Sequence, residues 1–137
     1  PTFMGKGSVD DRSPLSLPSV GLQTRDSATS GLDQADVVIC VGYDLVEIGP
    51  AAWNEKRRKR IVHLDSKPAE VDSCYVPEIE LVRDLKDTLR ALTRHLPAGP
   101  PPAYSTRLRL AVDIELRTVG GGRAGLVTPQ AAIAAIR

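Results

Sequence analysis

The chain has 137 residues, the length of one globular domain, and folding at that size buries roughly two-thirds of the unfolded chain's surface. An apolar share of 42% and a charged share of 26% are typical of a globular protein and exclude a disordered or fibrous one. The formal net charge of +1 gives no overall attraction to nucleic acid, and no apolar run approaches the roughly 20 residues of a membrane-spanning helix. Without a signal peptide at the N-terminus, the chain is expected to be cytoplasmic, with no nucleic-acid or membrane partner.

The chain opens on a glycine-rich segment, TFMGKG at residues 2–7, followed by Ser8. A phosphate-binding loop needs four residues between its first glycine and a Gly-Lys-Ser/Thr ending, and the spacing here does not fit. A glycine turn that leaves a strand is the expected structure. No starting methionine, helix or N-cap precedes the segment, which indicates a piece of a longer protein that begins inside a fold.

Three short apolar segments predict parallel strands, at residues 36–42, 60–65 and 80–82. The first of them, DVVICVG, is a continuous β-branched run, typical of a strand covered on both faces of a parallel sheet. The chain has two cysteines, Cys40 inside this run and Cys74 before Tyr75, and they have neither CxxC spacing nor the paired histidines of a zinc site. We expect both to be buried thiols and no metal site in this chain.

Short helices are expected around these strands. Residues 27–35 suit a helix before the first strand, and residues 50–54 a single helical turn after it. Residues 68–71 follow the second strand with Pro68 at the first helical position. The βαβ alternation predicts an α/β fold: a Rossmann-like parallel sheet with flanking helices.

The C-terminal third begins with the clearest helix, residues 84–95, where leucines recur at helical spacing and an aspartate stands at the start. The proline-rich residues 97–102 end it and indicate a domain boundary or linker. Residues 104–119 predict a charged amphipathic helix that the glycines at 120–122 end. A last helix is expected within residues 127–137, with Thr128 as N-cap and proline at the first helical position.

Candidate ligand contacts follow the first two strands: Gly42, Asp44 and Asp65. Ligands of open α/β sheets gather at the carboxyl ends of the strands, where an acid can bind a ribose hydroxyl, so these are candidates for nucleotide binding only. An isolated Asp in such a loop more often bonds a turn or caps a helix. Structural roles are favoured for His63 and His95, because no nearby Ser or Cys completes a nucleophile–base pair. The basic run at residues 55–60 lacks interleaved aromatics and is expected to be a solvated loop.

Several segments resemble, in family order, the central domain of thiamine-diphosphate enzymes of the acetolactate synthase type: TFMGKG at 2–7, ADVVICVGYD at 35–44, WN at 53–54, IVHLD at 61–65, PAEVD at 68–72 and ELVRD at 80–84. The run from Gly42 to Glu47, with Pro50 and the Trp-Asn pair, is similar to the catabolic, flavin-independent enzymes more than to the biosynthetic branch. The resemblance implies a later part of the central domain at residues 1–96. It implies a linker with a helix at 97–126 and the start of the C-terminal cofactor-binding domain at 127–137.

In the whole enzyme the resemblance implies thiamine diphosphate and Mg²⁺, and the joining of two pyruvates into 2-acetolactate with release of carbon dioxide. The activating glutamate would lie in an N-terminal domain, and a Gly-Asp-Gly signature with a distant Asn in the C-terminal one; this sequence contains no Gly-Asp-Gly. We therefore expect no catalytic residue and no metal ligand on this chain. No FAD is expected either, because the acidic Asp44 and Glu47 follow Gly42 where the flavin-holding biosynthetic relatives carry a basic residue. The expected partners are the remaining domains of the parent enzyme and further copies in a homo-oligomer.

Two other functions remain open from the residues alone. A free-standing nucleotide-binding module would use the strand-end aspartates and the glycine loop. A small interaction domain without catalysis would present the helix at residues 104–119 to a partner.

Overall fold

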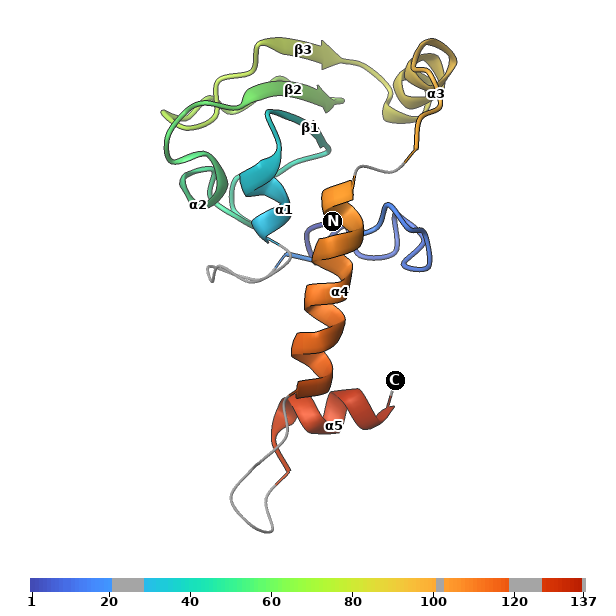
Figure 1. Ribbon diagram of the computed structural model, residues 1–137. Helices are drawn as coiled ribbons and strands as arrows, with labels where there is room; N and C mark the ends of the chain where they lie inside the picture. The colour runs from blue at the N-terminus through green and yellow to red at the C-terminus, as the bar shows by residue number, and fades with distance from the viewer. Residues whose placement is uncertain (21–28, 101–102, 119–126, 137) are drawn as a thin grey trace.

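The computed structural model describes residues 1–20, 29–100, 103–118 and 127–136 (Figure 1). Residues 1–20 form turns without regular secondary structure. The elements in chain order are α1 (Thr29–Gln34), β1 (Val37–Val41), α2 (Ala51–Asn54), β2 (Arg60–Asp65), β3 (Ile79–Val82), α3 (Leu85–His95), α4 (Ala103–Thr118) and α5 (Pro129–Ile136).

The strands form one parallel sheet in the order β1-β2-β3. In register, Cys40 of β1 lies beside His63 of β2, and His63 lies beside Glu80 of β3. All three predicted strands are confirmed, and with the flanking helices they give the α/β architecture expected from the sequence. The β-branched runs succeed as predictors because extended backbone suits their stiff side chains.

The two faces of the sheet differ in how they are covered. Paired residues of parallel strands point to the same side, so the register sorts the side chains. One side, here called the covered face, carries Cys40, Ile61 and His63, all buried. On the opposite side, Val37, Ile39 and Val41 of β1 are 40%, 50% and 44% exposed.

Apolar side chains of β3 continue this second side of the sheet. We call it the open face and define it by its exposed residues Val37, Ile39, Val41, Ile79 and Leu81. The expectation that the first strand is covered on both faces is therefore wrong for the described residues. Leu64 of β2 shares this side with Val41 and Leu81 but is fully buried, and among the described residues β2 contacts α3.

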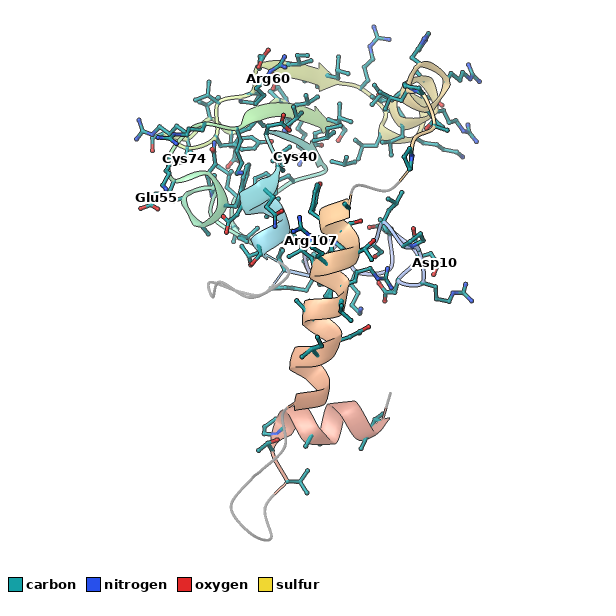
Figure 2. All side chains as sticks on the ribbon, viewed as in Figure 1. Asp10, Cys40, Glu55, Arg60, Cys74 and Arg107 are labelled. Atoms are coloured by element: carbon teal, nitrogen blue, oxygen red, sulfur yellow. The ribbon has the colours of Figure 1, made fainter. Side chains whose placement is uncertain are left out.

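The core lies under the covered face, between the sheet and the short helices α1 and α2 (Figure 1). Its buried residues are Cys40, Ile48, Trp53, Ile61 and Tyr75. Cys40 and Cys74 are both free and buried, as the sequence predicts (Figure 2). At about 25 cal/mol per Å² of apolar surface removed from water, these side chains supply the main stabilisation of the domain.

The connections between the strands contain one predicted helix and lack another. The single turn after β1 is confirmed as α2, whereas the helix expected at residues 68–71 is absent. Tertiary bonds occupy this stretch: the Ala69 N–H donates to the Glu80 carboxylate, and Asp72 and Tyr75 exchange backbone hydrogen bonds. The helix signal of Pro68 is thus outweighed by the bond from Ala69 to Glu80 and by the turn that Asp72 and Tyr75 close.

The helices of the C-terminal third agree with their sequence signals. Asp84 caps α3 by accepting a hydrogen bond from the Asp87 N–H at 2.9 Å, and Thr128 caps α5 by accepting one from the Ala131 N–H at 3.2 Å. The predicted helix at 104–119 is α4; the glycines at 120–122, expected to end it, lie outside the described residues. Residues 27–28 of the first predicted helix also lie outside them.

In the described part of the chain, none of the helices has the length and apolar character needed to cross a membrane.

Candidate functional site

The fold brings the three predicted ligand contacts to one edge of the sheet, because β1 and β2 are adjacent and parallel. Gly42 leaves β1 with φ +59°, a left-handed conformation that glycine adopts without strain, and its N–H donates to the Leu64 carbonyl at 2.9 Å. A Cβ at this position would stand 3.6 Å from Leu85 Cδ1 of α3. The helix α3 therefore packs closely against the end of β1.

Both aspartates at this edge bond to neighbouring backbone. Asp44 is exposed and accepts a hydrogen bond from the Val46 N–H at 2.9 Å. Asp65 is half-buried and accepts hydrogen bonds from the amides of Ser66 and Lys67. This geometry is that of turn-forming aspartates, and a role of either residue in nucleotide binding stays a prediction.

Replacing Asp65 by alanine is expected to lower the free energy of unfolding by about 1 kcal/mol, because two amides lose a charged acceptor. Asp65→Asn, which keeps an oxygen acceptor, should lose less. Urea unfolding followed by fluorescence measures both variants. An unchanged midpoint for Asp65→Ala would show that the turn does not depend on the carboxylate.

A polar and aromatic cluster under the covered face was not predicted as a unit. Tyr43, Trp53 and Tyr75 pack with ring centroids 5.2 to 6.2 Å apart. The Tyr43 hydroxyl donates to the Ile48 carbonyl and accepts from Trp53 Nε1 at 3.2 Å. The contacts tie the loop after β1 to α2.

His63 connects this cluster to the crossover between β2 and β3. It is 2% exposed, with Nδ1 2.8 Å from the Tyr75 hydroxyl and Nε2 3.2 Å from the Lys67 carbonyl. Because a carbonyl only accepts, Nε2 carries the proton and Nδ1 accepts from the tyrosine. Both ring nitrogens are used within the fold, which agrees with the structural role favoured for this histidine.

Alkaline pH is expected to destabilise the fold through this cluster. Burial raises the pKa of Tyr43 to about 12, partly opposed by the Trp53 hydrogen bond, and burial also raises the pKa of Tyr75. An unfolded tyrosine ionises near pH 10, so the fold prefers the neutral phenol. This contribution to stability is complete below about pH 10 and is lost as pH rises through about 12.

Urea unfolding between about pH 9 and about pH 11.5 measures the effect. The midpoint should fall over this interval, and Tyr43→Phe should flatten the curve. A midpoint independent of pH in the unsubstituted chain would contradict the burial of neutral tyrosines.

Other charged groups of the described chain form no obvious chemical site. Within residues 1–20, 29–100, 103–118 and 127–136, no three His, Cys, Asp or Glu side chains gather closely enough to hold a metal ion. In the basic run, Lys59 Nζ donates to the carbonyl of Ala35, and Arg60 makes a bidentate pair with Glu78 at 2.8 Å. These interactions anchor the end of the run, while residues 55–58 are exposed.

Two hollows in the described structure are lined in part by helices. One, of about 240 Å³, lies between the N-terminal turns and α4 and carries both Lys6 and Arg109 and two aspartates, so its charges are mixed. The other, of about 460 Å³, lies along α3, is mainly apolar and includes Leu81. The second hollow therefore continues the open face of the sheet.

The sequence of this chain is similar to segments of known proteins. Residues 1–92 match the family model described as thiamine pyrophosphate enzyme, central domain. The chain is 43% identical over 93 residues to the catabolic acetolactate synthase of Raoultella terrigena, covering 67% of this chain and 16% of that protein. It is 39% identical over 89 residues to an acetolactate synthase of Bacillus subtilis, covering 64% of this chain and 16% of that protein.

A pyruvate oxidase of Lactiplantibacillus plantarum is 32% identical over 93 residues, 66% of this chain and 15% of that protein. The chain thus spans about one sixth of the length of the relatives that it matches.

Proposed function

The chain belongs to the family of thiamine pyrophosphate enzyme central domains, and from this premise we propose that it acts as the non-catalytic central domain of an acetolactate synthase-like enzyme. The whole enzyme would join two pyruvates into 2-acetolactate and release carbon dioxide. The central domain would space the two domains that contact the cofactor and lend surface to a cytoplasmic homo-oligomer. The similarity to two acetolactate synthases supports this choice within the family.

The open face of the sheet is the observation that carries the proposal. Five apolar side chains, from both outer strands of the described sheet, are each at least 36% exposed, and the hollow along α3 extends them. A contiguous apolar surface of this kind marks a contact with further protein. Parallel sheets are normally covered on both faces, so other parts of the parent enzyme would pack against the open face.

Catalytic groups would be supplied by those remaining parts. Stabilisation of the carbanion formed from pyruvate would come from thiamine diphosphate, held with Mg²⁺ by the C-terminal domain and activated by a glutamate of the N-terminal domain. The strand-end aspartates of this chain bond to their own turns, which supports an architectural role for this edge of the sheet.

The loop after β1, at residues 42–47, argues against FAD on this chain. After Gly42, the loop carries Asp44, which is exposed, and Glu47, whose Oε2 is buried and has no hydrogen-bond partner among the described residues. A carboxylate about 4 Å from a diphosphate repels it by roughly 1 kcal/mol in water, and by more where partly buried. Two acidic side chains therefore oppose the phosphate-bearing part of the flavin, and the flavin-independent type is the better fit.

The proposal predicts that the purified chain alone forms no 2-acetolactate from pyruvate in the presence of thiamine diphosphate and Mg²⁺. The preparation should be colourless, with no flavin released on denaturation. The complete catabolic enzyme of Raoultella terrigena serves as the positive control for the assay. Acetolactate above the level of a no-protein blank would contradict the architectural role, and stoichiometric FAD would contradict the flavin-independent type.

The alternative of a free-standing nucleotide-binding or interaction module is not favoured, because the family match covers residues 1–92.

A further inference from the structure

Helix α4 lies outside the segment that matches the central-domain family, which ends at residue 92. It follows the proline-rich stretch and would be a free linker if nothing held it. In the structure its first turns run between α1 on one side and the N-terminal turns on the other (Figure 1). At its C-terminal end, α4 contacts α5 (Figure 1).

One arginine on α4 bonds to the N-terminal turns. Arg109 Nη1 donates to the carbonyls of Ser13 and Ser16, the latter at 3.0 Å, and Nη2 approaches the carbonyl of Asp11 at 3.4 Å. The three acceptors precede the arginine by more than 90 residues. A planar guanidinium suits such convergent acceptors, and bonds from a charged donor are stronger than neutral ones.

The carbonyls are presented by a turn with bonds of its own. The Ser13 N–H donates to the Asp10 carbonyl at 2.9 Å, and the Ser16 N–H donates to the Ser13 carbonyl at 3.0 Å. These bonds curl the chain so that the carbonyls of Asp11, Ser13 and Ser16 face α4. The acceptor set is thus formed by backbone rather than by side chains.

Apolar contacts support the same attachment. On α4, Leu108 is 8% exposed and Ser105 is 4% exposed. A Cβ added at Gly31 of α1 would stand 3.4 Å from Leu108 Cδ1 and 2.6 Å from Leu17 Cδ1. The glycine therefore leaves room for both the N-terminal turns and α4 to pack on α1.

We propose that Arg109 is a latch that fixes α4 to the N-terminal turns, so that the first turns of this helix are an integral part of the central domain. At 1.5 Å per residue the 16-residue helix is about 24 Å long. A latch near its start consequently sets the direction in which the chain leaves the domain and the position from which α5 begins. This assignment does not depend on which reaction the parent enzyme performs.

Hydrogen–deuterium exchange on the full chain tests the latch. Arg109→Ala is expected to raise amide exchange at least tenfold in residues 103–112 and 10–17, while the strands β1 and β2 exchange as before. Arg107→Ala is the matched control, because Arg107 is exposed on the same helix (Figure 2). It should leave exchange unchanged.

Arg109→Lys keeps the charge but lacks the planar fork, and the same confined increase, smaller in size, is expected from it. Exchange in Arg109→Ala no faster than in Arg107→Ala would overturn the latch. So would an equal rise in β1 and β2, since it would indicate general destabilisation. Exchange in Arg109→Lys identical to that of the unsubstituted chain would show that charge alone holds the helix, and would overturn the assignment to the guanidinium.

Discussion

Replacing Tyr75 by alanine is expected to lower the free energy of unfolding by about 3–5 kcal/mol, the usual cost of removing a buried aromatic ring. Tyr75 is 1% exposed and packs against Tyr43 and Trp53, with ring centroids at 5.2 and 6.2 Å. It also anchors the crossover between β2 and β3, which has no helix to cover the sheet. The loss would therefore remove both packing and the anchor of that segment.

Tyr75→Phe separates the hydroxyl from the ring. It keeps the packing but leaves Nδ1 of the buried His63 without its donor, at a cost of about 1–3 kcal/mol. Urea unfolding followed by the fluorescence of Trp53, the only tryptophan of the chain, measures both variants. A loss below about 1 kcal/mol for the alanine variant, or an equal loss for both, would contradict the packing role of the ring.

The second large effect concerns the open face and requires the rest of an enzyme. A chimera carries residues 1–92 of this chain in place of the matched segment of the Raoultella terrigena enzyme. Ile39→Lys should lower acetolactate formation by the chimera at least tenfold, because a charge buried without a partner costs about 3–5 kcal/mol. In the isolated chain Ile39 is half exposed, so the same change should cost less than about 1 kcal/mol.

Val46→Lys is the matched control, since Val46 is 87% exposed and lies in a loop outside the open face. The chimera should tolerate it. Equal activity of the Ile39→Lys and Val46→Lys chimeras would mean that the open face is not covered in the enzyme. A chain that unfolds on Ile39→Lys alone would point instead to a local role of this side chain in the strand.

Local signals in the sequence were enough to predict the strands and most helices. Continuous β-branched runs indicated β1 and β2, and a capping aspartate with leucines at helical spacing indicated α3. The failed helix at residues 68–71 shows the limit of such signals. Its backbone amide at Ala69 is bonded by Glu80, eleven residues further on, and no local pattern announces that partner.

For the candidate site, the position of Gly42, Asp44 and Asp65 at one sheet edge followed from the order of strands and loops. The aromatic and histidine cluster did not, because Tyr43, Trp53 and Tyr75 come from separate loops and helices that only the tertiary fold brings together. In the sequence, only His63, a histidine inside an apolar strand, indicated such a cluster. The exposure of the open face was not predicted either, because a continuous β-branched run is typical of a strand covered on both faces and does not show which segment supplies the cover.

Acetolactate formation by the unsubstituted chimera tests the central claim most directly. If residues 1–92 form an architectural central domain, the chimera should assemble as the parent enzyme does and convert pyruvate to 2-acetolactate at a rate within about tenfold of it, because every catalytic group comes from the retained domains. A chimera that folds and elutes like the parent enzyme yet forms no 2-acetolactate would contradict the claim that this chain is such a domain.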